Sequence, residues 1–297
     1  MNTVEIKNLV KTYGDTVAVD DLSFALKQGE ILGLIGPNGA GKSSTIKILL
    51  DFMRPDSGEV RILGQKMGEA LKDRIGYLPE ERGLYKRLTV IELILYLASL
   101  KGMGRNEAEE RADRLLQRTG MYEYRDKKNK EMSKGMGQLI QFIVTVVHDP
   151  DLIILDEPFS GLDPVRTAAV QAIISDLRDR GKSVILCTHQ MDKVEEICNR
   201  VLMMHQGRTL LYGDVLETRK QFRRNTVRVA AGGEIGDLPG VLERRPQNGA
   251  VELVLAPGSS PQAILDRLRE DGIEIQHFEI VTPQLRDIFL ELVGGEK

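Results

Sequence analysis

The sequence is poor in several residue types that mark particular classes of protein. It contains no tryptophan, 5% aromatic residues and only two cysteines among 297 residues. Cys187 and Cys198 form neither a CxxC pair nor a Cys/His ligand pattern, which excludes a disulfide-stapled scaffold and a zinc site. Both thiols are predicted to be reduced and to lie in the core.

Long apolar runs are also missing. The longest ones, 90–100 and 139–147, fall short of the roughly 20 residues that a bilayer-spanning helix needs. The N-terminus MNTVEIKN lacks the charged and then apolar pattern of a signal peptide. We therefore expect a chain that stays in the cytoplasm unless a partner holds it at a membrane.

Basic charge is not in excess. Residues 226–297 carry 7 Lys and Arg against 12 Asp and Glu, whereas residues 1–225 carry 34 against 32. A nucleic-acid binder needs a strongly basic footprint, so we expect no nucleic-acid partner. Hydrophobic and charged contents of 41% and 29% are ordinary for a globular protein.

The order of patterns along the chain predicts an α/β core. Strand-like runs occupy the first 36 residues, 58–64 and 74–80, and 3.6-residue periodicity extends over 90–148. Apolar strands then alternate with helical patterns, which favours a helix-covered parallel sheet. A hairpin is expected with Gln206 and Gly207 at its turn. We place a domain boundary in the basic stretch 217–225, which gives domains 1–225 and 226–297, the latter a small strand-and-helix unit.

A phosphate-binding loop is the most specific motif. Gly36-Pro-Asn-Gly-Ala-Gly-Lys42-Ser43 fits G-x-x-x-x-G-K-[ST] and lies between a strand-like run and a helical one. The glycines allow successive N–H groups to turn toward phosphates, Lys42 reaches the β and γ groups, and the Ser43 hydroxyl ligates Mg²⁺. The motif predicts nucleotide binding.

An acidic pair follows an apolar strand at residues 156 and 157. Ligands bind at the carboxyl ends of parallel strands. There Asp156 would suit the Mg²⁺ shell, and Glu157 would orient and deprotonate a water that attacks the γ-phosphate. A solvent-facing acidic turn is the alternative interpretation. His189 ends the next strand-like run and is expected at the same edge, facing phosphate rather than serving a purely structural role.

Two further motifs are typical of helix caps. Ser133 in EMSKGMGQ precedes an apolar helical run, so it is either an N-cap or part of an anion site at a helix N-terminus. Asp163 followed by Pro164 is typical of an N-cap and a first helical residue. A cap and a binding role can hold together in both places.

Taken in order, Tyr13, GPNGAGKSS, GYLPE, MSKGMGQ, LIILDEP, SGLD and TH cover about the first 215 residues. This series resembles the ATP-binding cassette (ABC) transporter ATPase family. The resemblance implies an α/β P-loop NTPase fold of the ABC-ATPase type, with a mixed sheet core, N-terminal antiparallel strands, a helical subdomain at about 90–148 and a small α+β C-terminal domain. GYLPEERGLY, SKGMGQ and the C-terminal unit resemble the sodium-extrusion NatA type and related export cassettes.

The resemblance also implies roles in holding ATP and Mg²⁺. Tyr13 would stack on adenine, although a tyrosine that ends a strand is common without such a role. Glu80 stands where the family usually has a glutamine that touches Mg²⁺, and it would join Ser43 and Asp156 there. The phosphates would be held by Gly36, Asn38, Gly39, Ala40, Gly41, Lys42, Ser43 and Ser44.

The remaining implied roles concern catalysis and a second subunit. Glu157 and His189 match the catalytic base and the γ-phosphate switch. Ser133 and Gly135 would cap ATP held by the other subunit's phosphate loop, and Asp163 would lie in the inter-subunit loop.

Three residues depart from the family pattern. Lys134 replaces a glycine, Met136 replaces a glutamine and Glu80 replaces the loop glutamine. A carboxylate at 80 can still ligate Mg²⁺, whereas Met136 cannot hydrogen-bond as glutamine does. We expect tuned rather than lost catalysis.

These features together predict an ATP-binding and ATP-hydrolysing transporter subunit. It would form a homodimer, or a heterodimer with a similar cassette, and drive export by a separate membrane permease at the cytoplasmic face. The permease would dock on the helical block 90–148 and the groove near 80–88. The alternatives are an ATP-dependent regulatory module without hydrolysis and an ABC-type ATPase that acts on non-membrane targets. Residues 226–297 would regulate, stabilise the dimer or only pack, and measuring dimerisation after their deletion distinguishes these roles.

Overall fold

The protein divides into two compact units. A computed structural model describes residues 1–80, 83, 85–222, 225–233, 235–247 and 249–294, and the units are Met1–Val215 and Leu216–Lys297. The division precedes the boundary expected after residue 225. Its physical reason is helix α8 (Val215–Gln221), which takes up much of the basic stretch. Within the second unit, Arg219 of α8 donates a hydrogen bond from Nε to the Pro283 carbonyl at 2.9 Å. Positions 223 and 224 lie outside the described residues.

A six-stranded sheet forms the centre of the first unit. Its order is β5-β6-β7-β3-β8-β9, with all neighbours parallel except the β8–β9 pair. The three innermost of the parallel strands are entirely buried because helices and a second sheet cover both faces. The strands are β3 (Ile31–Ile35), β5 (Ile75–Leu78), β6 (Leu152–Asp156), β7 (Ser183–Cys187), β8 (Arg200–His205) and β9 (Arg208–Asp214).

The β8–β9 hairpin turns at the two residues that the sequence predicts. Gln206 and Gly207 have φ values of 46° and 83°. Two consecutive positive φ angles define the tight hairpin turn whose twist matches that of the flanking strands. This prediction is confirmed.

A second sheet, of three antiparallel strands, precedes and packs on the first. Its order is β2-β1-β4, and the strands are β1 (Asn2–Tyr13), β2 (Thr16–Lys27) and β4 (Ser57–Ile62). One apolar cluster joins the two sheets and helix α1, with Ile6 and Leu22 on one side and Leu34 and Leu152 on the other. The expected mixed core with N-terminal antiparallel strands is confirmed.

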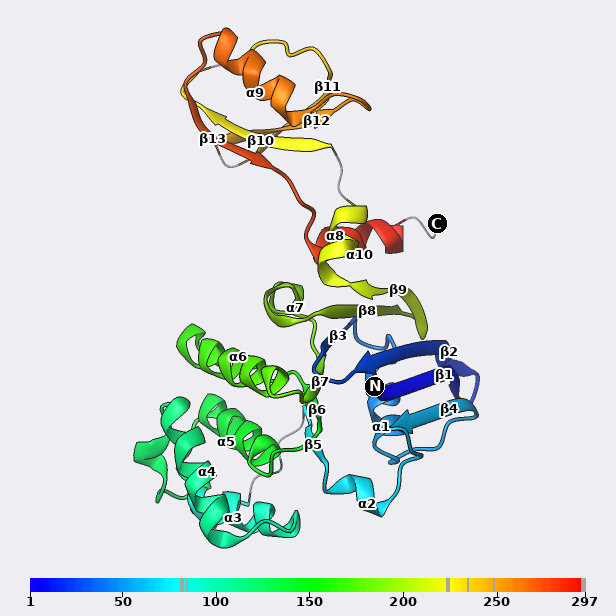
Figure 1. Ribbon diagram of the computed structural model, residues 1–297, viewed down its shortest axis with the longest axis vertical. Helices are drawn as coiled ribbons and strands as arrows, with labels where there is room; N and C mark the ends of the chain where they lie inside the picture. The colour runs from blue at the N-terminus through cyan, green and yellow to red at the C-terminus, as the bar shows by residue number, and fades with distance from the viewer. Residues whose placement is uncertain (81–82, 84, 223–224, 234, 248, 295–297) are drawn as a thin grey trace. The chain divides into compact units, whose positions relative to one another are not determined.

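Helices cover the parallel strands. Figure 1 shows α3, α4 and α5 grouped on one side of these strands and the three-stranded sheet on the other. The helical block falls within the range 90–148. Its first helix starts at a capping box, in which Thr89 Oγ1 accepts from Glu92 N at 3.3 Å and Glu92 Oε2 accepts from Thr89 N at 2.8 Å. The helices are α1 (Lys42–Leu49), α2 (Glu69–Lys72), α3 (Val90–Leu100), α4 (Arg105–Arg118), α5 (Lys134–Val146), α6 (Pro164–Asp179) and α7 (Met191–Ile197), with short 3₁₀ turns η1 (Tyr122–Tyr124) and η2 (Asn129–Glu131).

The second unit is a small α+β domain, as expected. Its antiparallel sheet has the order β11-β12-β10-β13, and α9 supplies Ile264 and Leu268 to a core with Val227 and Leu253 of the sheet. Ser260 caps α9 by accepting from Ala263 N at 3.1 Å. The elements are β10 (Thr226–Ala231), β11 (Val241–Gln247), β12 (Ala250–Leu255), α9 (Pro261–Glu270), β13 (Ile275–Ile280) and α10 (Leu285–Gly294).

Both cysteines lie in the core of the first unit. Cys187 and Cys198 are free thiols and both are buried, which confirms the expectation of core cysteines. In the part of the chain that the structure describes, no helix combines the length and apolarity of a membrane span.

Candidate functional site

The phosphate loop connects β3 to α1, and two of its glycines leave no room for a side chain. Gly41 has φ 102°, and a Cβ there would lie 2.4 Å from the Ala18 carbonyl oxygen. A Cβ on Gly36 would lie 2.3 Å from the Met204 carbonyl oxygen. Because the chain passes this close to its neighbours, the loop keeps the tight path that turns backbone N–H groups toward an anion.

The charged end of Lys42 lies across this loop. Its Nζ donates to the carbonyls of Gly36 at 2.7 Å and Pro37 at 3.0 Å. The ammonium is therefore held beside the loop backbone at the start of α1, where it adds positive charge to the helix N-terminus. Loop residues Asn38 and Gly39 are exposed, whereas Ala40 is buried.

Tyr13 lies beside the same loop. Its hydroxyl is 3.4 Å from Ser44 Oγ and 2.6 Å from the Met53 sulfur, and 44% of the residue is exposed. An exposed ring next to the phosphate-binding backbone is available for stacking on a base. The adenine contact of Tyr13 stays a prediction.

A cluster of acidic side chains surrounds Asp156 at the end of β6. Burial raises the pKa of Asp156, and the Glu80 and Glu157 carboxylates raise it further, while Cys187 and Lys42 oppose the shift. Burial and the charge of Asp156 also raise the pKa of Tyr77 to about 12. Converging carboxylates repel one another unless a cation neutralises them.

The oxygen-rich chemistry of this cluster fits Mg²⁺, a hard cation that prefers oxygen ligands. In the described ranges, no three His, Cys, Asp or Glu side chains are placed to hold a metal by themselves. Mg²⁺ commonly takes one or two protein ligands and completes its shell with water and substrate phosphates. The Ser43 hydroxyl and the Asp156 carboxylate, predicted from the sequence, are oxygen groups of the kind that such a shell uses.

The Glu157 carboxylate is fixed by three donors. Thr188 Oγ1 lies 3.0 Å from Oε2, His189 N lies 2.9 Å from Oε1, and His189 Nδ1 lies 2.7 Å from Oε1. His189 Nδ1 is engaged by Glu157, so Nε2 is the ring nitrogen left for another partner. The imidazole is 70% exposed, so Nε2 is accessible to a ligand.

The backbone of Glu157 is also unusual. Its φ of 49° lies in the left-handed region, and its N–H donates to the Cys187 carbonyl at 2.8 Å. A non-glycine residue in this region costs free energy and is common where a side chain must be aimed. The turn after β6 therefore directs Glu157 toward β7 and the residues that follow it.

Helix α5 begins as the cap interpretation predicts. Ser133 Oγ accepts from Met136 N at 3.3 Å, and a Cβ on Gly135 would lie 2.6 Å from the Gly161 carbonyl oxygen. Gln138 Nε2 donates to the Glu157 carbonyl at 3.2 Å. The start of α5 is thus packed against the loop that follows the acidic pair.

Asp163 ends that loop and caps α6. Its Oδ1 accepts from Arg166 N at 2.9 Å, and Pro164 occupies the first turn. The predicted capping role of Asp163 is confirmed.

The start of α5 and the phosphate loop, both predicted to bind ATP, are not bonded to each other within one chain. Among the described residues, no hydrogen bond or ion pair joins Ser133 or Gly135 to the phosphate loop. Thr188 and Gln138 were not among the residues predicted from the sequence. Thr188 directly precedes His189 at the end of a buried strand, which is the signal that points to it.

Known proteins resemble this chain in sequence over both units. Residues 19–160 match the family model described as ABC transporter, and residues 213–293 match that of the ATP-binding protein DrrA1-3-like C-terminal domain. An uncharacterized ABC transporter ATP-binding protein of Bacillus subtilis, YhaQ, is 37% identical over 98% of each chain. Nod factor export ATP-binding protein I of Sinorhizobium fredii is 31% identical, covering 99% of this chain and 86% of its own length.

A solved structure shows the same fold. The structure described as the ATP binding subunit of an ABC transporter has a TM-score of 0.69 and 32% sequence identity, covering 74% of this chain and 93% of its own. Along with the nearly full-length likeness to YhaQ, this agreement shows the family. The chain belongs to the ATP-binding subunits of ABC transporters, a family of enzymes that hydrolyse ATP.

Proposed function

We propose that this chain dimerises on ATP and drives export by a separate membrane permease. The observation that carries the proposal is the Glu157 carboxylate, which Thr188 and His189 hold at the sheet edge beside Asp156 and Lys42. Membership in an ATP-hydrolysing family favours this role over an ATP-dependent regulatory module. The resemblance to NatA-type cassettes and the export function in the name of the Sinorhizobium relative support the outward direction.

Hydrolysis follows from the proposed roles of these side chains. A water oxygen attacks the γ-phosphorus while Glu157 accepts the water proton, and the bond from the γ-phosphorus to the bridging oxygen breaks to leave ADP and phosphate. Lys42 would neutralise charge on the β and γ groups, and His189 Nε2 would donate to the γ-phosphate in the imidazolium form, in which both ring nitrogens carry hydrogen. Ser43 and Asp156, with Glu80 near them, would hold Mg²⁺, which neutralises phosphate charge.

Dimerisation would complete the site. The N-terminus of the 13-residue helix α5 carries a partial positive charge that favours phosphate. Ser133 and Gly135 of one subunit would contact ATP held by Gly36–Ser44 of the other. A two-fold arrangement of this kind forms two equivalent ATP sites.

An apolar groove on the first unit supports permease docking. It has a volume of about 300 Å³, and its lining includes Phe52, Tyr77, Leu97 and Leu100, with Lys101 among the polar residues. Phe52 and Leu100 are 69% and 60% exposed. We propose that a short amphipathic cytoplasmic helix of the permease binds there. The groove involves α3, α5 and β5. Of the segment 80–88 that was also predicted to dock, positions 81, 82 and 84 lie outside the described residues.

The permease proposal is tested by purifying the chain from detergent-solubilised membranes. We expect an integral membrane protein, identified by mass spectrometry, to co-purify and to raise ATPase activity in proteoliposomes. Phe52→Asp should abolish co-purification because it places a charge in the apolar groove. Tyr122→Asp, at an exposed aromatic residue of the helical block outside the groove, should not. Equal recovery of the partner with both variants would place docking elsewhere.

Glu80→Gln tests whether the acid at this position tunes the metal site. Removing a carboxylate near Asp156 lowers the local negative charge, so we expect the Mg²⁺ concentration for half-maximal ATPase activity to rise roughly fivefold. The exposed and distant Glu59→Gln serves as the control. Unchanged Mg²⁺ dependence and turnover would show that the acid at 80 has no special role.

A further inference from the structure

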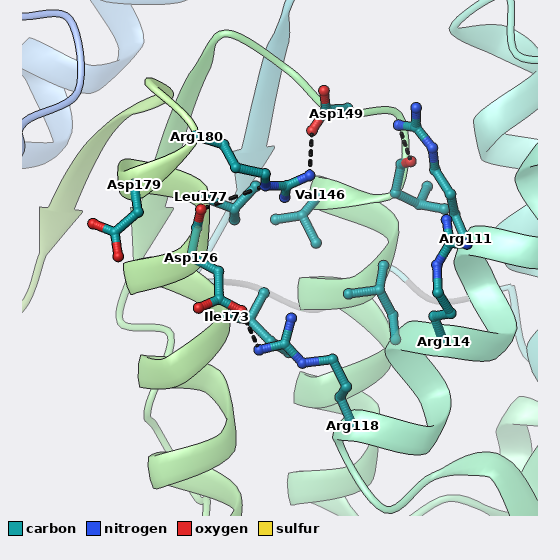
Figure 2. Close-up of a pocket in the computed structure, with 12 residues that line it drawn as sticks. Arg111, Arg114, Arg118, Val146, Asp149, Ile173, Asp176, Leu177, Asp179 and Arg180 are labelled. Carbon is teal, nitrogen blue, oxygen red and sulfur yellow. Dashed lines mark hydrogen bonds and ion pairs between the residues drawn. The ribbon is translucent and has the colours of Figure 1, made fainter.

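A cavity separates the helical block from helix α6. It has a volume of about 520 Å³ and is lined by residues of α4, of the end of α5 and of α6. Figure 2 shows Arg111, Arg114 and Arg118 projecting from α4, and Arg118 reaching across to Asp176 on α6. The size is within the range of small-molecule sites. None of the ATP-site residues described above lines it.

Its wall is basic and its floor is apolar. Arg111, Arg114 and Arg118 are three and four residues apart, so they share one face of α4. Arg180 adds a fourth guanidinium just beyond α6. The floor consists of Leu115, Val146, Val147, Ile173 and Leu177. A basic wall over an apolar floor is suited to a ligand that has both an anionic group and an apolar part.

The ion pairs inside the cavity leave two arginines for a ligand. Arg118 pairs with Asp176 at 2.6 Å, and Arg180 pairs with Asp149 at 3.3 Å. Asp149 is further neutralised by Lys182 at 3.1 Å. With the ion pair of Asp179 and Arg178 at 2.8 Å, these contacts engage the three carboxylates that line the cavity without using Arg111 or Arg114.

Among the described residues, the ion pairs of Arg111 and Arg114 are with carboxylates on their own helix, and Arg111 Nη1 also donates to the Val147 carbonyl at 3.4 Å. Arg111 lies 2.8 Å from Glu107, and Arg114 pairs with Glu110, each four residues earlier. Glu107 and Glu110 are 57% and 71% exposed and do not line the cavity. Exposed pairs of this kind contribute little free energy. A better-placed anion can therefore replace them.

We propose that this cavity binds an organic anion with an apolar body. The carboxylate, phosphate or sulfonate group would accept hydrogen bonds from Arg111 and Arg114, and the body would lie on Leu115, Ile173 and Leu177. The ligand would contact α4 and α6 together, beside the Arg118–Asp176 ion pair that already links them. Since α6 begins at the loop that packs on Gly135, such a ligand would fix the helical block relative to the catalytic sheet.

The test uses the fluorescent sulfonate 1-anilinonaphthalene-8-sulfonate and its neutral parent, N-phenyl-1-naphthylamine. Both are titrated into the full chain with MgADP present, so that the phosphate loop is occupied. A hydrogen bond to a charged group contributes roughly tenfold in affinity. We expect Arg114→Gln to weaken sulfonate binding by about that factor and to leave binding of the neutral parent unchanged.

Arg105→Gln is the matched control, because Arg105 is an exposed arginine on α4 that does not line the cavity. It should bind the sulfonate as the wild type does. Arg114→Gln leaves the Arg118–Asp176 ion pair in place, so a loss of affinity is not due to separation of the helices. Equal sulfonate affinity in both variants and the wild type, or equal affinity of the wild type for both probes, would overturn the proposal. The readout is independent of ATP hydrolysis and of any permease.

Discussion

Glu157→Gln is expected to lower ATP turnover by about 10²- to 10⁴-fold, the contribution typical of a general base. Glutamine has nearly the same shape, and its carbonyl can accept from His189 N, as the carboxylate does at 2.9 Å. The Thr188 hydroxyl can rotate to accept from the new amide. The side chain should therefore keep its place while losing the ability to accept a proton from water.

Loss of hydrolysis with intact binding should also trap the dimer. If ATP closes the Ser133–Gly135 segment of one subunit over the phosphate loop of the other, the Glu157→Gln protein should be dimeric with MgATP and monomeric with MgADP. Light scattering coupled to size-exclusion chromatography measures both states. Glu196→Gln is a suitable control, because Glu196 is an exposed carboxylate of α7 that pairs with Lys193 at 2.9 Å. Full ATPase activity in the Glu157→Gln protein would remove Glu157 from the base role.

The sequence predicted those parts of the site that depend on local geometry. Gly36 and Gly41 of the phosphate loop have neighbours that leave no room for a side chain, and the Gln206–Gly207 turn requires positive φ at both positions. Asp163 and Ser133 cap helices within a few residues of themselves. Constraints between residues close together in the sequence can be recognised from the sequence alone.

Features that depend on residues distant in sequence were missed. We placed the domain boundary in the basic stretch 217–225, and nothing local there indicates that α8 forms and that Arg219 contacts Pro283, a residue of the C-terminal region. The Glu and Arg pattern of α4 is typical of a solvated helix face, and nothing local indicates that Arg118 meets Asp176. The hydrogen bond from Gln138 to the Glu157 carbonyl likewise requires the folded sheet. Contacts between residues far apart in the sequence cannot be recognised from a short stretch of it.

Gly135→Ala is expected to lower ATP turnover by about a hundredfold, since displacement of catalytic groups by about 1 Å can have that effect. A Cβ at this position would lie 2.6 Å from the Gly161 carbonyl oxygen, closer than such atoms approach one another. Either the start of α5 or the loop before Asp163 must move. The helix itself does not suffer, because alanine is favoured over glycine in a helix by about 1 kcal/mol.

The Gly135→Ala substitution should slow ATP hydrolysis without weakening ATP binding. The phosphate loop has no contact with Gly135 among the described residues, so the affinity of the isolated chain for ATP, measured by calorimetry, should stay within about twofold of the wild type. Gly104→Ala is the matched control, because Gly104 precedes α4 and a Cβ there would have no atom within 4 Å. It should keep full turnover. If the Gly135→Ala protein hydrolyses ATP as fast as this control, the close contact between Gly135 and Gly161 serves packing alone. Ser133 would then reach the γ-phosphate of ATP without that contact.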